Sequence, residues 1–261
     1  MFLKANNIKS AHAFSTRWGG VSRLSHTADF NLAFDRGDDE GTVIRNLELF
    51  ASEANFDAHT VISLPQIHSD IIYKVDKCDA GQGYYVKEGL REGDGYVTNS
   101  PFVTLGVKSA DCVPVIFEAY DKEKIIAVGA VHAGWRGSVK GIAPKCVGML
   151  CDEYGARAEN IRVAIGPCIH KCCFEVGEDF LVQFRAEVGD ELASLFVSPA
   201  ECEGKYFCDL VALNKRLLAD AGILPENIEI VDRCTCCEPE TFFSHRYSKG
   251  LRGTMLSVIK I

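Results

Sequence analysis

Two predicted strand ends carry side chains that could do chemistry. The apolar run 125–131 has the length and composition of a buried strand, and His132, Trp135 and Arg136 follow it directly. The glycines among them let the backbone turn sharply and approach a ligand closely. Twenty residues before the histidine, Cys112 precedes a second apolar run. An imidazole, an indole, a guanidinium and a thiol therefore gather where strands begin or end, and a site would be built there.

His68 adds a second imidazole, shortly after the apolar run 61–64. Two imidazoles and one thiolate are suitable zinc ligands, and three protein ligands leave a fourth position open for water or substrate, as in catalytic zinc sites. His68, Cys112 and His132 are separated by 44 and 20 residues, a spacing that matches no local metal-binding signature. The residue types suit a metal site, but the spacing does not identify one, and a histidine or cysteine near a strand end is more often packed or hydrogen-bonded than bound to a metal.

The same side chains also suit a reaction without a metal. Cys112 could act as a nucleophile with His132 as its base, as in thiol hydrolases and deamidases, where a nearby imidazole activates the thiolate. Asp94 or Asp111 could then orient the imidazole. The residues alone leave both interpretations open.

Arginine side chains form a second group of candidates. Arg17 stands at the end of a strand-like segment, beside a Gly-Gly turn, and Asn31 follows shortly after. A guanidinium next to free backbone N–H groups suits phosphate or another oxyanion, although a surface arginine packed on Trp18 fits the same pattern. Arg136 could stack on Trp135 or face a pocket.

Composition and charge narrow the function classes. The chain has 261 residues, 47% of them hydrophobic and 25% charged, which suits one large globular domain over 1–261. The net charge of −8 and the scattered lysines and arginines argue against nucleic acid as a partner. Neither a P-loop nor a G-x-G-x-x-G loop occurs. No run is long enough to cross a membrane, and the first residues lack the apolar core of a secretion signal, so we expect a cytoplasmic protein.

Twelve cysteines are many for a chain of this length. The expected compartment argues against a disulfide framework, and we expect most of them to be reduced thiols. Cys146 and Cys151 share one apolar helical stripe and illustrate simple packing. The dense groups in 168–173 and 234–237 could bind a structural metal, but neither holds a repeated C-x-x-C pair, so packing of small residues is the simpler interpretation.

Periodicity predicts three helices, 41–55, 138–154 and 209–221. Ser138 is expected to cap the second helix, and Pro144 to kink it. Nine short β-rich runs lie around them: 61–64, 71–75, 96–98, 103–107, 113–117, 125–131, 161–165, 228–231 and 255–261. Some runs are joined too closely for a helical crossover, which favours an α+β fold with a mixed β-sheet flanked by helices.

Several motifs, spaced along nearly the whole chain, resemble one known signature. Four of them are Gly93–Thr98 (GDGYVT), Ser109–Val115 (SADCVPV), His132–Gly137 (HAGWRG) and Ala164–Cys168 (AIGPC). The match extends to Thr16–Ser22, Gln66–Ser69, Cys173–Gly177 and Phe242–Arg246. In this order they resemble the laccase-domain family, long described as multicopper polyphenol oxidases and now as purine nucleoside phosphorylases with adenosine deaminase activity. The bacterial peptidoglycan editing factor is a member.

The resemblance implies a fold, a metal and a reaction. The fold would be three-layer, α/β/α-like and related to cysteine hydrolases. His68, Cys112 and His132 would be the catalytic residues and the metal ligands, usually for zinc, with copper as an alternative. The reactions would be phosphorolysis of adenosine, inosine and methylthioadenosine, and deamination of adenosine. The partners would be a small nucleoside and phosphate, bound by a monomer or homodimer.

Substrate contacts are assigned on the same basis. Arg17 is predicted to hold phosphate, with Arg136 as the second choice. Trp135 is predicted to form an aromatic wall for the purine, and Asn31 is predicted to bind substrate. Arg246 is a weaker candidate, because the motif around it lacks a second arginine common in the family.

Other functions stay open at this point. A cysteine hydrolase or amidase acting on a cell-wall precursor would use Cys112 as its nucleophile. A multicopper phenol oxidase would need more histidines than the seven present, none of which is paired as H-x-H, so any oxidase activity would come from copper at the same three ligands. A binding module without turnover is the non-enzymatic alternative.

Overall fold

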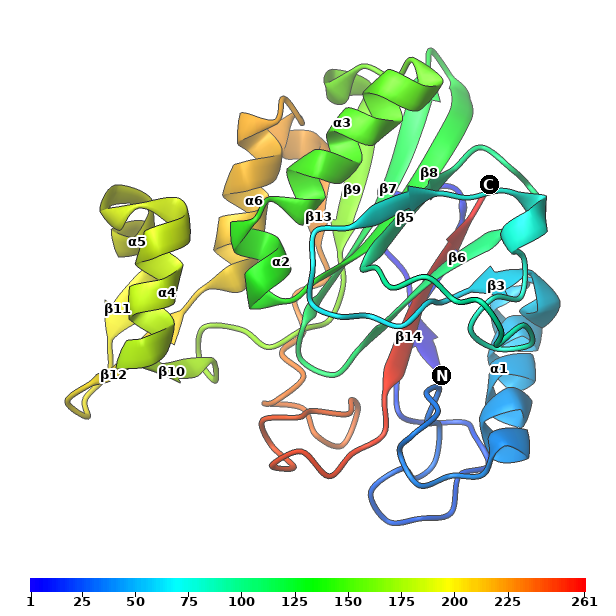
Figure 1. The fold of residues 1–261 in the computed structure, drawn as a ribbon, viewed down its shortest axis with the longest axis horizontal. Coiled ribbons are helices and arrows are strands. Elements are labelled where there is room, and N and C mark those ends of the chain that lie inside the picture. The colour runs from blue at the N-terminus through cyan, green and yellow to red at the C-terminus, as the bar shows by residue number, and fades with distance from the viewer.

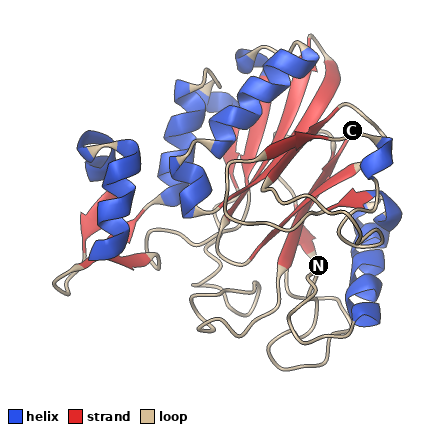
Figure 2. Ribbon diagram, in the orientation of Figure 1, coloured by secondary structure: helices blue, strands red, loops and turns tan.

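Two packed β-sheets with helices on their outer faces make up most of the computed structural model, which describes residues 1–261 (Figures 1 and 2). The six-stranded sheet has the order β13-β9-β7-β8-β5-β4, and the five-stranded sheet the order β1-β2-β14-β6-β3. The first comprises β4 (Ile72–Lys74), β5 (Gly95–Thr98), β7 (Val113–Asp121), β8 (Lys124–Ala133), β9 (Ile161–Ile165) and β13 (Ile228–Ile230). The second comprises β1 (Phe2–Leu3), β2 (Ala11–Ser15), β3 (Val61–Ile62), β6 (Thr104–Ser109) and β14 (Met255–Lys260).

Three apolar layers hold these elements together. Helices α2 (Trp135–Val139), α3 (Ile142–Tyr154) and α6 (Leu210–Asp220) cover the outer face of the six-stranded sheet, and α1 (Glu40–Ala54) covers the other sheet (Figure 1). The third apolar layer lies between the two sheets. Alternating side chains of central strands point to opposite layers, so Phe117 packs under the helices while Ile116 packs between the sheets.

A small peripheral unit projects from this body at the left of Figure 1. It contains β10 (Glu175–Gly177), α4 (Glu178–Val188), α5 (Asp190–Phe196), β11 (Val197–Pro199) and β12 (Lys205–Cys208). Its three strands form an antiparallel sheet of their own. These strands are three or four residues long, and none of them was among the predicted runs.

The predicted α+β class and the mixed sheets flanked by helices are confirmed, and the β layer is double. All nine predicted β-rich runs lie in or overlap a strand, and the helices predicted at 41–55 and 209–221 are α1 and α6. No helix of the molecule combines the length and apolar character needed to cross a membrane.

The helix predicted over 138–154 is wrong as a single element. The chain forms α2 and α3 instead, separated at Gly141, whose φ of 74° is left-handed and stops the first helix. Pro144 therefore falls in the first turn of α3, where its missing N–H costs no helical hydrogen bond, and it makes no kink. Ser138 lies inside α2, where its hydroxyl donates to the carbonyl of Ala133 rather than capping a helix.

Candidate functional site

His68, Cys112 and His132 come together at one end of the six-stranded sheet. Their ring nitrogens and sulfur all lie within 4.8 Å of one another, and Nε2 of His68 is 3.8 Å from Sγ of Cys112. A nitrogen and a sulfur bound to one tetrahedral zinc would be about 3.6 Å apart. Three residues spread over 65 positions of the chain thus form one compact cluster, called here the His/Cys cluster.

The strand register explains this convergence. Cys112 directly precedes β7, and His132 is near the end of β8, its antiparallel neighbour, where it lies opposite Pro114. Strand β5 pairs with the other edge of β8, which brings Asp94, the residue before β5, beside the imidazole. His68 comes from the loop between β3 and β4.

Asp94 is the buried anchor of the cluster. Its carboxylate accepts hydrogen bonds from the backbone N–H groups of Ile67, His68 and Ser69, and from the Ser69 hydroxyl. It also lies 2.8 Å from Nδ1 of His132, which leaves Nε2 of that ring to face the cluster. One carboxylate therefore fixes the loop that carries the first imidazole and the orientation of the second.

The backbone is shaped to leave space between the three side chains. A Cβ atom at Gly134 would lie 2.8 Å from Cδ2 of His68 and 3.4 Å from Sγ of Cys112, so only glycine fits there. His68 and Asp111 have left-handed φ angles of 59° and 98°, uncommon for residues with a side chain. Hydrogen bonds hold both: the first through Asp94, the second through the Thr235 hydroxyl, which donates to the Asp111 carboxylate at 2.6 Å.

The charges of the cluster favour a thiolate. Burial alone would raise the pKa of Cys112, but the imidazoles of His132 and His68 outweigh it and lower that pKa to about 6. Burial alone would lower the pKa of His132, but the Cys112 sulfur and the Asp94 carboxylate raise it to about 9. At neutral pH the sulfur is therefore ionised, the form in which cysteine binds metals and acts as a nucleophile.

This donor set fits one borderline-soft metal ion. It supplies a thiolate and two imidazoles, and a carboxylate supports one imidazole from behind, as is usual for metal-binding histidines. With three ligands it provides for a single ion and not for the several ions of a multicopper centre.

Two cavities meet at the cluster and share His68, Ala110, Cys112 and Arg252. The first has a volume of about 250 Å³ and is mainly apolar and aromatic, and we call it the apolar cavity. Its other lining residues are Asp111, Trp135, Ile169, Phe174, Leu210, His245 and Arg246. The second, about 270 Å³, is polar, and we call it the basic cavity. Its other lining residues are Ala33, Phe34, Asp35, Arg36, Gln66, Lys108, Ser109, His132 and Thr254.

Arg36, Lys108 and Arg252 give the second cavity its positive charge, with Asp35 as the one acidic residue in its wall. None of the three cations forms a salt bridge. Arg252 donates to the carbonyl of Gly253 and to the Thr254 hydroxyl, and its buried Nε has no partner. A partly buried guanidinium without an acidic partner is suited to bind an anion.

The structure places the predicted phosphate ligand Arg17 outside both cavities. Its guanidinium donates to the carbonyls of Ala28 and Pro239 and lies 4.8 Å from the centre of the Phe243 ring. Asn31 is fully buried and donates to Asp38 and to the carbonyl of Ala33. Both side chains are engaged in holding loops together, and our proposal below assigns phosphate to other residues.

Trp135 and Arg136 have different positions relative to the two cavities. Trp135 lines the apolar cavity, as an aromatic wall would. The guanidinium of Arg136 stacks on the indole at 4.3 Å and is not part of either cavity wall. The stacking alternative for Arg136 therefore describes this structure, and the indole remains our candidate contact for a base.

Replacing Arg17 with alanine should lower stability and leave substrate affinity unchanged. The change removes three charge-assisted hydrogen bonds to carbonyls, worth about 1–2 kcal/mol together at this half-buried position. We expect Tm to fall by roughly 3–6 °C. Thermal unfolding and the KM for phosphate would be measured side by side. A large rise in that KM with unchanged Tm would restore Arg17 as the phosphate ligand.

Sequence reasoning missed the basic residues of the second cavity. Arg36, Lys108 and Arg252 come from a loop, from β6 and from the segment before β14, and none stands in a recognisable phosphate-binding pattern. Arg252 offers the one weak signal, because it lies three residues before the terminal strand, and charged residues at strand ends often line sites. The pairing of β14 with β6 brings Lys108 and Arg252 together, and the loop between β2 and α1 adds Arg36.

Comparison with known proteins agrees with this architecture. A family model described as multi-copper polyphenol oxidoreductase laccase matches residues 11–261. Purine nucleoside phosphorylase YlmD of Bacillus subtilis is 34% identical over 258 residues, covering 97% of this chain and 89% of that protein. Adenosine deaminase RL5, from an unknown prokaryotic organism, is 32% identical, covering 93% of this chain and 90% of that protein.

A solved structure shares the fold. The crystal structure of the hypothetical protein YfiH from Bacillus licheniformis superposes with a TM-score of 0.87 at 34% identity, covering 96% of this chain and 92% of that one. Because the family model spans nearly the whole chain and relatives above 30% identity cover it almost end to end, the chain belongs to the multi-copper polyphenol oxidoreductase laccase family.

Proposed function

We propose that this protein is a zinc-dependent purine nucleoside enzyme that catalyses phosphorolysis of adenosine and related nucleosides and deaminates adenosine. One observation supports this most: the His/Cys cluster lies where an apolar, aromatic cavity meets a basic one. A nucleoside with phosphate needs that combination, because the base is flat and apolar while phosphate is a dianion. The names of the relatives YlmD and RL5 agree with the two reactions.

The apolar cavity would hold the purine. Trp135 and Phe174 offer aromatic surfaces for stacking, and Leu210 and Ile169 exclude water. His245 and Arg246 are polar residues in the same wall, and we assign them to the nitrogen atoms of the base. A few polar groups in a mainly apolar cavity are the usual source of orientation for a small ligand.

The basic cavity would hold phosphate, and the ribose would lie between the two. Arg252 lines both cavities, so it can contact phosphate while facing the sugar. In phosphorolysis a phosphate oxygen forms a bond to the anomeric carbon, and the bond to the purine nitrogen breaks with its electron pair. Arg252, Arg36 and Lys108 would position the nucleophile by holding its other oxygens.

His68, Cys112 and His132 would hold the zinc ion. When bound, zinc would supply Lewis-acid chemistry, which activates a water molecule for attack at C6 of adenosine. Asp94 keeps Nδ1 of His132 engaged and thereby presents Nε2 to the centre. The thiolate form of Cys112 is favoured by both imidazoles, so this ligand needs no further base to release its proton near neutral pH.

Product analysis tests the function. The purified protein would be incubated with adenosine, with and without inorganic phosphate. Inosine in both reactions reports deamination, and adenine with ribose 1-phosphate only in the presence of phosphate reports phosphorolysis. Absence of all three products from metal-loaded protein contradicts the proposal.

A cysteine hydrolase acting on a cell-wall precursor is the second candidate, and the geometry of the same residues supports it. Cys112, His132 and Asp94 stand in the relation of nucleophile, base and orienting carboxylate. The two functions differ in their inhibitors. A thiol hydrolase is inactivated by an alkylating agent and is indifferent to chelators, whereas the zinc enzyme loses activity on chelation and regains it with zinc.

The affinity for phosphate should depend on pH through Lys108. Burial and the nearby guanidinium of Arg36 lower the pKa of this lysine to about 8, against a smaller opposing effect of Asp35. Its ammonium group lies 3.4 Å from the carbonyl of Ser63 and above the Tyr84 ring. Lys108 is charged below pH 8 and loses its charge above it, so the KM for phosphate should rise by up to about tenfold per pH unit above 8.

Two variants isolate this effect. Lys108→Arg keeps the charge to much higher pH and should remove the rise, whereas Lys108→Met should give a high KM at every pH. The measurement is the KM for phosphate between pH 6 and about 9.5 in all three proteins. An identical pH profile in wild type and Lys108→Arg would contradict the assignment of Lys108 to phosphate.

A further inference from the structure

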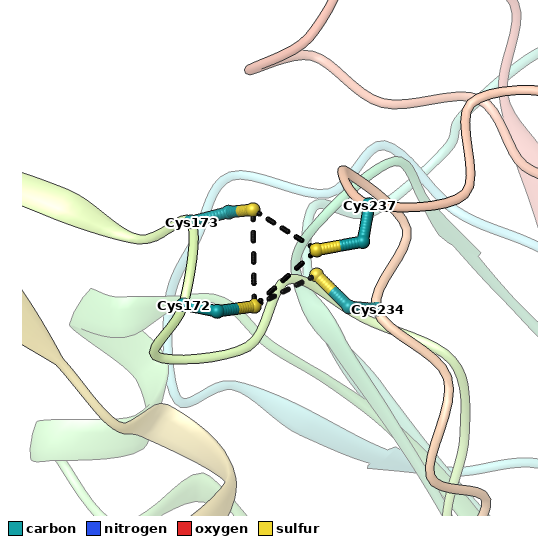
Figure 3. Close-up of side chains that lie close together, drawn as sticks. All are labelled: Cys172, Cys173, Cys234 and Cys237. Carbon is teal, nitrogen blue, oxygen red and sulfur yellow. Dashed lines mark hydrogen bonds between the residues drawn. The ribbon is translucent and has the colours of Figure 1, made fainter.

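Four cysteine sulfurs form a second cluster outside the cavities (Figure 3). Cys172 and Cys173 come from the turn before β10, and Cys234 and Cys237 from the loop after β13. The sulfur of Cys172 lies 3.8, 3.7 and 3.4 Å from those of Cys173, Cys234 and Cys237, and the sulfurs of Cys173 and Cys237 are 3.3 Å apart. All four point toward one centre in Figure 3, and all lie within 4.8 Å of one another.

These separations match a tetrahedral metal site. Sulfurs bound to one zinc at about 2.3 Å are about 3.8 Å apart. A disulfide would need a separation of about 2.05 Å, and all twelve cysteines of the chain are free thiols. Four thiols gathered at this spacing from two distant segments are not explained by apolar packing, because Cys172 and Cys237 are exposed.

The two loops are built to hold this arrangement. Residues Cys168 and Cys234 form a bridge of parallel β type, so the segment leading to Cys172 runs beside the loop that carries Cys234 and Cys237. The N–H of His170 donates to the sulfur of Cys234 at 3.4 Å, a contact that supports a thiolate ligand. Arg233 and Glu238, on either side of the second pair, join their side chains in an ion pair and close the base of that loop.

We propose that Cys172, Cys173, Cys234 and Cys237 bind one zinc ion with a structural role. Cys234 and Cys237 have the C-x-x-C spacing typical of such sites. The other two ligands are adjacent in the chain, which is why spacing alone did not indicate the site. Four thiolates complete the tetrahedron and leave no position for substrate, so the ion would stabilise structure and take no part in the reaction.

The site would fix one wall of the apolar cavity. Phe174, which lines that cavity, follows Cys173 directly, and the carbonyl of Cys173 accepts a hydrogen bond from the guanidinium of Arg246. On the other loop, Thr235 donates to Asp111, the neighbour of Cys112. Zinc would therefore join the start of the peripheral unit to the loop after β13 and hold both next to the apolar cavity. This inference stands apart from the proposed function, because it rests on different residues.

Metal counting and X-ray absorption test the proposal. Protein purified with zinc in the medium should carry two zinc ions per chain by native mass spectrometry, and the Cys112→Ser variant one. The ion that stays in Cys112→Ser should show only sulfur neighbours at about 2.3 Å. A shell of nitrogen and oxygen, iron in place of zinc, or no ion in the Cys112→Ser variant would overturn the site.

Paired variants assign the ligands and the effect on stability. Cys172→Ser/Cys237→Ser should lose the all-sulfur ion and keep the other, with a fall in Tm of roughly 5 °C or more. Cys202→Ser, an exposed cysteine in the turn between β11 and β12, is the matched control and should keep both ions and the wild-type Tm. If the double variant keeps both ions, the proposal is wrong.

A measurement on the wild-type protein covers the case in which the double variant does not fold. The four cysteines should resist iodoacetamide while zinc is bound, and a strong chelator should expose them, as read by peptide mass mapping. Cys78 and Cys202 should react equally in both states. Equal labelling of Cys172 and Cys237 with and without chelator would contradict metal binding.

Discussion

Replacing Cys112 with serine should remove the metal from the His/Cys cluster and reduce adenosine turnover by about 10³-fold or more. The sulfur of Cys112 lies 3.8 Å from Nε2 of His68 and next to the His132 imidazole. A serine hydroxyl is not ionised at neutral pH and is a poor zinc ligand. Metal content and turnover would be measured on the same sample, with Cys78→Ser, an exposed thiol, as the control.

A second substitution separates the two roles that Cys112 could have. Cys112→His keeps a metal ligand but cannot act as a thiol nucleophile. If the sulfur acts as a ligand, this variant should bind zinc and retain activity well above that of Cys112→Ser. Activity equal to that of the serine variant, with zinc bound, would favour the thiol nucleophile.

Replacing Asp94 with asparagine should weaken both the metal site and the fold. All five groups around the carboxylate of Asp94 are donors, and an amide would turn its own N–H groups toward some of them. We expect a loss of about 10- to 100-fold in zinc affinity and a fall of about 3 kcal/mol in the free energy of unfolding. Zinc titration and urea unfolding measure the two effects.

The matched control is Asp70→Asn. Asp70 lies in the loop that carries His68, but it is half-exposed and pairs only with Lys145 at the surface, so its replacement should change stability by less than about 1 kcal/mol. Unaltered zinc affinity in Asp94→Asn would contradict the role of this carboxylate in orienting His132.

The contribution of the Asp94 carboxylate to stability should decrease at acidic pH. Burial acts to raise the pKa of Asp94, but hydrogen bonds from His132 and Ser69 outweigh it and lower that pKa below its ordinary value. A lowered pKa means that the carboxylate stabilises the fold fully above its ordinary pKa, near 4. This contribution is lost as the pH falls toward the lower value in the folded state. The difference in stability between wild type and Asp94→Asn should therefore shrink with acidification.

Strand ends could be predicted from the sequence, because apolar runs mark strands and the polar residues that follow them collect at sheet edges. This reasoning singled out His68, Cys112 and His132, and the register of β7 and β8 brings the last two together. It also left Asp94 and Asp111 as equal candidates for orienting the imidazole. The structure distinguishes them, since Asp94 contacts His132 and Asp111 instead binds Thr235 and the backbone of Arg246.

The basic cavity and the four-cysteine cluster depend on contacts between residues far apart in the chain, and no local sequence pattern predicts such contacts. The basic cavity forms only when β14 pairs with β6, which joins residues about 150 positions apart. The four-cysteine cluster likewise depends on two loops more than 60 residues apart. The sequence around Arg17 resembles an anion-binding site. In the structure, however, the guanidinium of Arg17 donates its hydrogen bonds to backbone carbonyls.

Titrating metal-free protein with zinc while following adenosine turnover tests the central claim most directly. The wild-type protein would be used, and Cys112→Ser, stripped of metal in the same way, would be the control that takes up zinc only at the four-cysteine cluster. We predict negligible activity in metal-free wild type, a rise on adding zinc that is complete by two equivalents, and no rise in Cys112→Ser, with inorganic phosphate required for adenine release. Full activity in the metal-free protein, or no gain on adding zinc, would contradict the account.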